Sequence, residues 1–231
     1  MTDDRDRLKR EAALRAIEFV EDGMVVGLGT GSTAYFVIEG LGARVAAGLR
    51  IVGIPTSERS ATQARSLQIP LASFAEHQRL DLAIDGADEV ERGTLNLIKG
   101  LGGALLREKI VAAASRRFVI VVDDDKLVDR LGSRAPVPVE IAQFGWQSTA
   151  AALAKLGTEP ALRHTGEDQP FITDGGNYIV DCRFDGIADP GTLERQVGAI
   201  VGVVESGLFV GRSSAVVVAS SGGVEVLTRS T

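Results

Sequence analysis

The chain has 231 residues, of which 45% are hydrophobic and 24% charged, a composition typical of a globular protein that can bury a core. Its formal net charge is -6, and no run of Lys or Arg interrupts the acidic balance. Nucleic acid is therefore an unfavourable partner, because a phosphate backbone requires a basic face.

Two further features concern the compartment. Cys182 is the single cysteine, so no intramolecular disulfide can form and a reducing environment is expected. The charged start of the chain is unlike a signal peptide, and no apolar stretch approaches the ~20 residues that span a bilayer. We expect a soluble, cytoplasmic protein without a membrane segment.

The first half of the chain alternates between helical and strand patterns. Residues 3–21 place apolar side chains on one helical face, and Gly23 ends that helix. Four continuous apolar runs follow, which is typical of parallel strands buried on both faces: 24–28, 50–54, 80–84 and 118–122. Helical stretches separate them, at 33–47, 57–67 and 104–116. This order predicts an α/β fold with a doubly wound, mainly parallel Rossmann-like sheet.

The pattern changes after about residue 130. A strand, a helix, two strands, a helix and a strand are expected in turn, at 137–141, 148–156, 161–164, 177–183, 192–201 and 203–209. This β-α-β-β-α-β order predicts an inserted, smaller ferredoxin-like α+β domain. We predict domains at 1–130 plus 206–231 and at 131–205, with final strands at 215–219 and 224–228.

Polar and glycine residues follow all four strands of the first half. The segments are Gly-Thr-Gly-Ser-Thr at 29–33, Thr-Ser-Glu at 56–58, Asp-Gly-Ala-Asp-Glu at 85–89 and Asp-Asp-Asp-Lys at 123–126. Ligands of open parallel sheets bind outside the carboxyl ends of the strands, where these segments are expected to meet. The sequence therefore predicts a site at this edge of the sheet.

The glycine turn at 27–33 is suited to an anion, because glycines allow close approach and the following helix offers amide donors. A plain tight turn with Ser or Thr capping the helix is the alternative. A dinucleotide fingerprint is disfavoured by Ser32 and by Glu58, which lies roughly 30 residues on where ~20 is usual. A nucleotide P-loop would need Gly-Lys followed by Ser or Thr, which is absent.

The acidic turn at 85–89 leaves a buried strand, so its carboxylates could bind sugar hydroxyls, exchange protons or hold Mg²⁺. Simple surface solvation is the alternative. His77 and His164 lie away from the cluster, which disfavours a histidine triad or a histidine metal site. Further along, Lys99 precedes three glycines, and Glu108 falls in the first turns of a helix whose Leu105 and Ile110 indicate one buried side.

With these residues in view, the chain resembles the type A ribose-5-phosphate isomerases. The matching segments are the glycine turn at 29–33, the acidic turn at 85–89, Lys-Gly-Leu-Gly-Gly-Ala-Leu-Leu-Arg-Glu-Lys at 99–109, and Lys126. Weaker similarity covers 136–141, 173–181 and 207–209. The lysine–glycine segment together with the acidic turn is highly specific, whereas the glycine turn alone is not.

The resemblance implies interconversion of ribose 5-phosphate and ribulose 5-phosphate through an enediolate, without a cofactor or a metal, by a homodimer or homotetramer. It implies that Glu108 transfers the proton, Lys99 stabilises the oxyanion, Asp85 assists ring opening and Asp88 positions hydroxyls. The residues implied to contact the substrate are Thr30, Gly31, Ser32, Thr33, Asp85, Gly86, Ala87, Asp88, Lys99, Gly100, Leu101, Gly102 and Lys126.

Two departures from the family pattern concern charge and capping. Asp124 and Asp125 precede Lys126 where small or hydroxyl residues are common, and they would weaken phosphate binding unless they point away. Leu106 replaces a frequent Thr. Three rival functions remain: a non-catalytic sugar-phosphate sensor of the same fold, an NAD-dependent dehydrogenase and a sugar-phosphate deaminase. Glu108 together with Lys99 favours the isomerase over the sensor, and the scarcity of histidine disfavours the deaminase.

Overall fold

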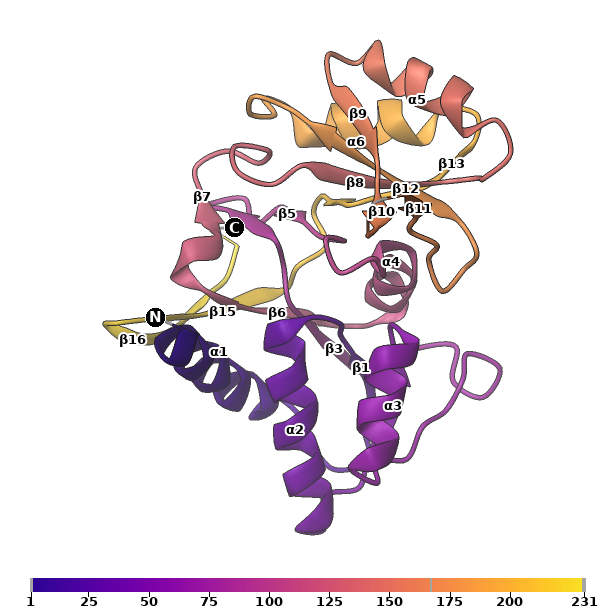
Figure 1. Cartoon of the computed structure of the whole chain (residues 1–231). Coiled ribbons are helices and arrows are strands. Elements are labelled where there is room, and N and C mark those ends of the chain that lie inside the picture. Colours follow the sequence, from indigo (N-terminus) through magenta and orange to yellow (C-terminus); the bar gives the residue numbers. More distant parts are fainter. Residues whose placement is uncertain (1, 167, 230–231) are drawn as a thin grey trace.

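The computed structural model describes residues 2–166 and 168–229. Its largest sheet has six strands, of which β1, β3, β6, β15 and β16 are labelled in Figure 1. The strands lie in the order β16-β15-β6-β3-β1-β2, and β16 is the antiparallel edge strand of an otherwise parallel sheet. Their bounds are β1 Val25–Leu28, β2 Val52–Pro55, β3 Leu82–Asp85, β6 Phe118–Asp123, β15 Ala215–Ser220 and β16 Gly223–Leu227. The expected mainly parallel α/β sheet is therefore confirmed.

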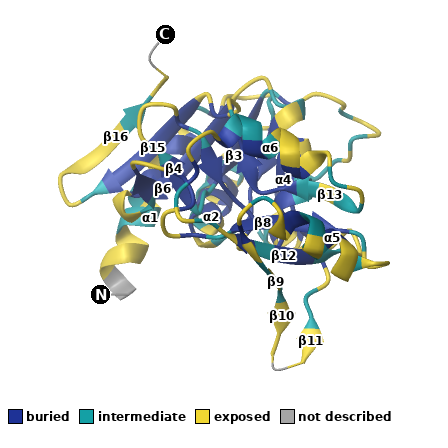
Figure 2. Cartoon of the chain, turned by 90° about the horizontal axis from the view of Figure 1, so that it is seen from above, coloured by how far each residue is buried: buried dark blue, intermediate teal, exposed yellow. Residues whose placement is uncertain are grey.

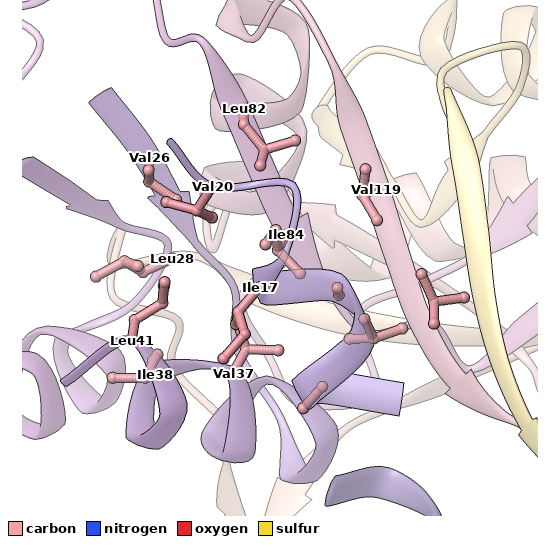
Figure 3. Packing of buried hydrophobic residues seen from close by; sticks show 14 of the residues in the cluster. Ile17, Val20, Val26, Leu28, Val37, Ile38, Leu41, Leu82, Ile84 and Val119 are labelled. Carbon is pink, nitrogen blue, oxygen red and sulfur yellow. The ribbon is translucent and has the colours of Figure 1, made fainter. Parts of the chain in front are cut away.

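Helices cover both faces of this sheet, which explains why its inner strands are mainly apolar. The helices are α1 Thr2–Ile17, α2 Ser32–Ala46, α3 Glu58–Ser66 and α4 Leu105–Ala114. Val119 and Val121 of β6 belong to the core shared with α1 and α2, part of which Figure 3 shows. Ile120 and Val122 belong to the core on the opposite face, shared with α4. The side chains on both faces of β6 are thus buried.

The strand order changes direction between β1 and β3. The chain runs from β1 outward to β2, and then returns past β1 to β3 and on to β6. In such sheets the crevice at the carboxyl ends of the two strands flanking the reversal is the usual ligand site. Leu28 pairs with Ile84 in register, so the turn after β1 and the turn after β3 lie side by side.

A second sheet of four antiparallel strands lies above α4 in Figure 1, in the order β13-β8-β12-β9. Its bounds are β8 Val137–Ile141, β9 Glu159–Leu162, β12 Tyr178–Arg183 and β13 Val203–Ser206, with α5 Trp146–Ala154 and α6 Pro190–Gly198 packed on it. The order of these strands and the helices between them match the β-α-β-β-α-β pattern, which confirms the ferredoxin-like α+β unit. The domain limits at 131–205 remain a prediction.

A short hairpin, formed by β10 His164–Thr165 and β11 Gln169–Pro170, extends from the antiparallel sheet as an exposed arm (Figure 2). At its base Arg163 N donates to Ile179 O over 2.9 Å, and Phe171 N donates to Arg163 O over 2.8 Å. The arm therefore starts from a residue that is bonded to the sheet on one side and to the returning strand on the other.

A third, small mixed sheet joins the two units and was not expected from the sequence. Its order is β14-β5-β4-β7, with β4 Glu89–Glu91, β5 Leu97–Ile98, β7 Leu127–Val128 and β14 Leu208–Phe209. Strands of two or three residues are too short to show a periodic pattern. The segment 203–209, expected as one strand, is in fact β13 in the antiparallel sheet and β14 in this small sheet.

Two helix predictions need correction. The first helix ends at Ile17 rather than 21, because Phe19 N and Val20 N bond three residues back, to Ala16 O and Ile17 O, in turns that leave the helix. Ile110 does not mark the buried side of α4, because it is 47% exposed. The buried side instead carries Leu105, Glu108, Lys109, Val111 and Ala112.

Within the residues that the structure describes, no helix is both long and apolar enough to cross a membrane.

Leu41 of α2 and Leu14 of α1 form a matched pair for testing this packing. Leu41 is fully buried in the core that α1 and α2 share with the sheet, whereas Leu14 is 51% exposed. We expect Leu41→Ala to lower the free energy of unfolding by ~2–5 kcal/mol, the usual cost of a buried leucine. Leu14→Ala should change it by less than ~1 kcal/mol, since little apolar surface is lost there. Urea unfolding of both variants checks the difference, and equal losses would contradict the packing described.

Candidate active site

The turn after β1 lies against the end of β3 in a way that only glycine permits at position 29. Gly29 N donates to Ile84 O over 3.0 Å, and a Cβ at position 29 would lie 2.3 Å from Oδ1 of Asp85. Gly31 has a φ of 119°, a conformation that side chains disfavour, and it caps the start of α2. The amides at the helix start, which attract anions, are thereby brought beside Asp85.

Three buried hydroxyl groups, those of Thr56, Ser57 and Ser60, hold this turn through Thr30. Thr30 Oγ1 lies 2.7 Å from Thr56 Oγ1, 2.8 Å from Ser57 Oγ and 3.1 Å from Ser60 Oγ. Ser60 Oγ in turn donates to Gly29 O over 2.6 Å. The end of β2 and the start of α3 therefore fix the position of Thr30, whose amide donates to Asp85 Oδ1 over 3.0 Å.

Lys99 is a buried cation between two buried carboxylates. Its side chain is 2% exposed, and its Nζ lies 3.1 Å from Asp85 Oδ2 and 3.3 Å from Glu108 Oε2. The same Nζ donates a hydrogen bond of 2.6 Å to Gly86 O. Within the described part of the chain neither of those two carboxylate oxygens has a hydrogen-bond partner, so the ammonium of Lys99 is their electrostatic partner.

One ammonium group, that of Lys99, faces two carboxyl groups, so the pKa values of Asp85 and Glu108 determine the charge of the cluster. Burial raises the pKa of Glu108 to about 8, an effect that Lys99 opposes and that repulsion from Asp85 and Asp88 reinforces. Burial also raises the pKa of Asp85, but Asp85 Oδ1 accepts the amides of Thr30 and Gly86, which favour its charged form. Within the residues that the structure describes, no backbone amide donates to Glu108, and a pKa of about 8 keeps its carboxyl group mainly protonated at neutral pH.

The charge of Lys99 is retained in this setting. Burial disfavours the ammonium, but Asp85 and Glu108 together outweigh that effect and raise the pKa of Lys99. Lys99 is thus a fixed positive charge at the base of the site, beside a carboxyl group that can gain and lose a proton.

Two cavities lie above this cluster and share three lining residues, Ser32, Asp88 and Lys126. The first has a volume of about 80 Å³ and is lined by Thr30, Gly31, Ser32, Thr33, Gly86, Ala87, Asp88, Lys99, Gly100, Gly102, Glu108 and Lys126. The second, of about 360 Å³, is lined by Arg5, Lys9, Ser32, Asp88, Leu101, Asp123, Asp125, Lys126, Arg134, Ala135 and Pro136. Lys99 and Glu108 therefore line the first cavity alone, whereas the second brings together four cationic side chains and three carboxylates: Arg5, Lys9, Lys126, Arg134, Asp88, Asp123 and Asp125.

Every residue lining the first cavity is among those predicted from the sequence. Two predicted residues lie elsewhere: Asp85 is buried beneath the cavity, where it contacts Lys99, and Leu101 lines the second cavity. His77 and His164 line neither cavity. Among the residues described, no group of three or more His, Cys, Asp or Glu is arranged to hold a metal ion.

Several residues at the site were not predicted. Lys9, Arg5 and Arg134 reach the second cavity from segments far away in sequence, and their isolated charges carry no pattern that could indicate it. Ser60 follows the Thr-Ser signal at 56–57 by a helix turn and could have been found from the cap spacing. Asp125, one of the two unexpected acids, forms an ion pair of 2.9 Å with Arg5, so its charge is compensated.

Comparison with known proteins agrees with this geometry. The family model for ribose 5-phosphate isomerase A (phosphoriboisomerase A) matches residues 52–223. Ribose-5-phosphate isomerase A from Gloeobacter violaceus is 64% identical over 227 residues, which cover 98% of each chain. The protein of that name from Gluconobacter oxydans is 57% identical over 218 residues, or 94% of each chain.

Solved structures give the same result for the fold. Ribose 5-phosphate isomerase A from Methanocaldococcus jannaschii superposes with a TM-score of 0.93 at 42% identity, covering 96% of this chain and 99% of that one. A D-ribose-5-phosphate isomerase in complex with phospho-erythronic acid gives a TM-score of 0.94 at 41% identity, covering 97% and 99%. The chain belongs to the ribose 5-phosphate isomerase A family.

Proposed function

We propose that this protein interconverts D-ribose 5-phosphate and D-ribulose 5-phosphate. The observation that carries the proposal is the buried pair of Lys99 and Glu108, which faces a small cavity edged by Asp88 and a glycine turn. Moving a carbonyl group from C1 to C2 requires removal of a proton from C2 and delivery of one to C1. A carboxyl group with a pKa of about 8 beside a fixed cation is suited to both steps.

Glu108 is the proposed proton carrier. Its ionised carboxylate takes the proton from C2 of the open-chain aldose, and the electron pair moves to the C1 carbonyl oxygen to form an enediolate. The same carboxyl group then returns the proton to C1, while the hydroxyl proton on O2 moves to O1 and leaves the ketone at C2. Atoms and charge balance, so no redox partner is consumed in the step.

Lys99 and the loop that follows it are the proposed stabilisers of the enediolate. A cation in a water-excluded site interacts strongly with an oxyanion, because the local dielectric is low. Lys99 lines the cavity and also contacts Asp85. The ring-opening role that the family resemblance implies for Asp85 remains a prediction, since Asp85 lies beneath the cavity in contact with Lys99. Asp88 lines the cavity directly and is the proposed partner of the sugar hydroxyls.

The phosphate group is assigned to the second cavity. Lys126 and Ser32 line both cavities, and Lys9, whose side chain is 17% exposed, lines the second. A phosphate bound there would meet two lysines and the start of α2 while the sugar reaches Lys99 and Glu108. Phosphate binding and proton transfer would then take place in two adjoining cavities that share Ser32, Asp88 and Lys126.

A non-catalytic sensor is the remaining alternative, since a sensor needs the phosphate cavity but not the proton carrier. The buried and costly placement of Glu108 favours the enzyme, because a carboxyl group held against its preferred charge state is typical of catalytic sites.

Assembly and location belong to the same proposal. A homodimer or homotetramer is supported by Phe144 and Val201, which are 97% and 93% exposed on adjoining loops. Those loops are joined by a hydrogen bond of 2.8 Å from Ala142 N to Gly202 O. A cytoplasmic location is supported by Cys182, a buried free thiol.

Glu108→Gln tests the role of the proton carrier, because the amide keeps the size of the side chain and cannot accept the proton. We expect kcat for ketopentose phosphate formation from ribose 5-phosphate to fall by ~10²–10⁴-fold, the usual contribution of a general base. The substrate KM should change by less than about fivefold, since the phosphate cavity is untouched. Steady-state kinetics with chelator present measure both.

Glu39→Gln is the matched control for that variant. Glu39 pairs with Arg10 at the surface and is remote from both cavities, so its kinetics should match the wild type. If the folded wild-type protein binds the sugar phosphate without converting it, the sensor becomes the better account and the proposed enzyme is wrong.

The pH dependence of kcat/KM tests the protonation state of Glu108. The base is active when ionised, so kcat/KM should rise with pH and level off above about 8. Below that value the slope of log kcat/KM should approach one per pH unit, because each unit removes about nine-tenths of the ionised form. Rates between pH 6.5 and 9 measure this, and a flat wild-type profile would contradict the raised pKa. The rise of kcat/KM with pH below about 8 should be missing in Glu108→Gln.

Lys126→Met tests the phosphate assignment. Loss of one of two proposed cationic contacts should raise the KM for ribose 5-phosphate by ~10–100-fold, because hydrogen bonds to charged groups contribute about 1.5–3 kcal/mol. The effect on kcat should stay below about threefold, since Lys126 is not assigned to the proton transfer. Lys155→Met, on an exposed helix end of the antiparallel unit, is the control. A kcat effect without a KM effect would place the phosphate elsewhere.

A further inference from the structure

The loop after Lys99 is a tight turn whose peptide groups point in defined directions. Gly103 N donates to Gly100 O over 3.0 Å, and the two glycines have φ values of 82° and 106°. Leu101 N donates to Asp88 Oδ2 over 2.9 Å. Gly102 lines the first cavity, and its amide has no hydrogen-bond acceptor among the residues described. An amide with no protein acceptor at the wall of this cavity can donate a hydrogen bond to an oxyanion that forms there.

Arg163, at the base of the β10–β11 arm, holds the opposite side of this turn. Its Nη1 donates to Gly100 O over 2.9 Å and to Leu101 O over 3.2 Å. Its Nε donates to Asp181 Oδ2 over 2.9 Å, and its Nη2 donates to Asp181 Oδ1. The guanidinium thus spans from strand β12 to the turn, with one edge on a carboxylate and the remaining nitrogen on two carbonyls.

The planarity of the peptide bond links Arg163 to the cavity. In a trans peptide the carbonyl oxygen and the following amide hydrogen point in opposite directions. Every described peptide bond is trans. Because Arg163 draws the Leu101 carbonyl toward the antiparallel sheet, the Gly102 amide must point away from that sheet, and Gly102 lies at the cavity wall.

We propose that Arg163 is a positioning residue that aims the Gly102 amide at the oxyanion of the reacting sugar. The inference rests on the proposed function and adds to it a residue of the antiparallel unit that never meets the substrate. Arg163 lines neither cavity, and its side chain is 13% exposed. Its effect on the reaction passes through one peptide group.

Arginine is required here for geometric reasons. A lysine has one nitrogen and cannot bond a carboxylate edge-on while also reaching two carbonyls, whereas the planar guanidinium does both. The aromatic ring of Phe171 lies beside the guanidinium, with its centroid 5.9 Å from Arg163 Cζ. The same ring fills the space beside Gly103, where a Cβ would lie 2.3 Å from Phe171 Cζ. The turn and the arginine are therefore packed as one unit.

Arg163→Met removes the hydrogen bonds and keeps the apolar stem. We expect kcat to fall by ~10–100-fold, somewhat less than the loss of a whole oxyanion donor, because the amide remains but is no longer fixed. The KM for ribose 5-phosphate should change by less than about threefold, since the ground-state phosphate contacts are intact. Arg163→Lys should behave more like Arg163→Met than like the wild type.

A pair of inhibitors separates positioning from a general structural effect. Phospho-erythronic acid presents a planar carboxylate where the enediolate presents its oxygens, whereas inorganic phosphate reports only on the phosphate cavity. In Arg163→Met the inhibition constant of phospho-erythronic acid should rise in proportion to the loss of kcat, while that of phosphate changes by less than about twofold. An equal loss of both affinities, or a kcat within threefold of the wild type, would overturn the proposal.

Two further variants keep the test decisive if Arg163→Met is poorly folded. Asp181→Asn leaves the arginine in place but removes the charge of its anchor, so we expect a smaller fall in kcat. The inhibition constant of phospho-erythronic acid should again rise while that of phosphate stays nearly unchanged. Arg183→Met, an exposed arginine on the same strand, should leave both constants at wild-type values. Loss of kcat in Glu108→Gln but not in Arg163→Met would refute this inference alone, whereas an inactive wild type would refute the proposed function as well.

Discussion

A buried ammonium group, that of Lys99, determines how the surrounding residues are arranged. Taking a charge out of water costs several kcal/mol even after relaxation, so it persists only where opposite charges and hydrogen bonds surround it. Asp85, Glu108 and the carbonyl of Gly86 provide these contacts. Removal of Lys99 would leave two carboxylates facing each other without water. The turns that carry these groups are therefore bound to one another by charge as well as by packing.

A second buried cation anchors the helix that bears Glu108. Lys109 Nζ lies 3.1 Å from Glu194 in α6 and 2.8 Å from Glu205 in β13, so α4 is tied to the antiparallel unit one residue after the proton carrier. The ring of Phe209 lies near both buried lysines, 5.6 Å from Lys99 Nζ and 4.9 Å from Lys109 Nζ. An aromatic face attracts cations without neutralising them, which suits a position between two ammonium groups.

The sequence was informative wherever a local pattern was long enough. The four- to six-residue apolar strands of the central sheet and the first-cavity residues could be predicted, because each strand end carries its functional residues within a few positions. Strand β5, of two residues, shows no period and was missed, and β14, also of two residues, was not separated from β13. Ile110 misled because α4 turns a polar stripe inward, toward a site. Arg163 meets Gly100 across 63 residues, a contact created only by the tertiary fold.

The small mixed sheet has a mechanical consequence. The chain leaves for the antiparallel unit through β7 and returns through β14, the two outer strands of this sheet, while β4 and β5 lie between them. Asp88 N bonds to Ile98 O over 2.8 Å, and Lys99 N bonds to Gly207 O over 2.9 Å. A swing of the antiparallel unit would strain the strand pairs β7–β4 and β14–β5, and Asp88 and Lys99 flank the inner strands of these pairs. The joint between the two units passes through the site itself, so rigidity at this hinge and alignment of the reacting groups are the same property.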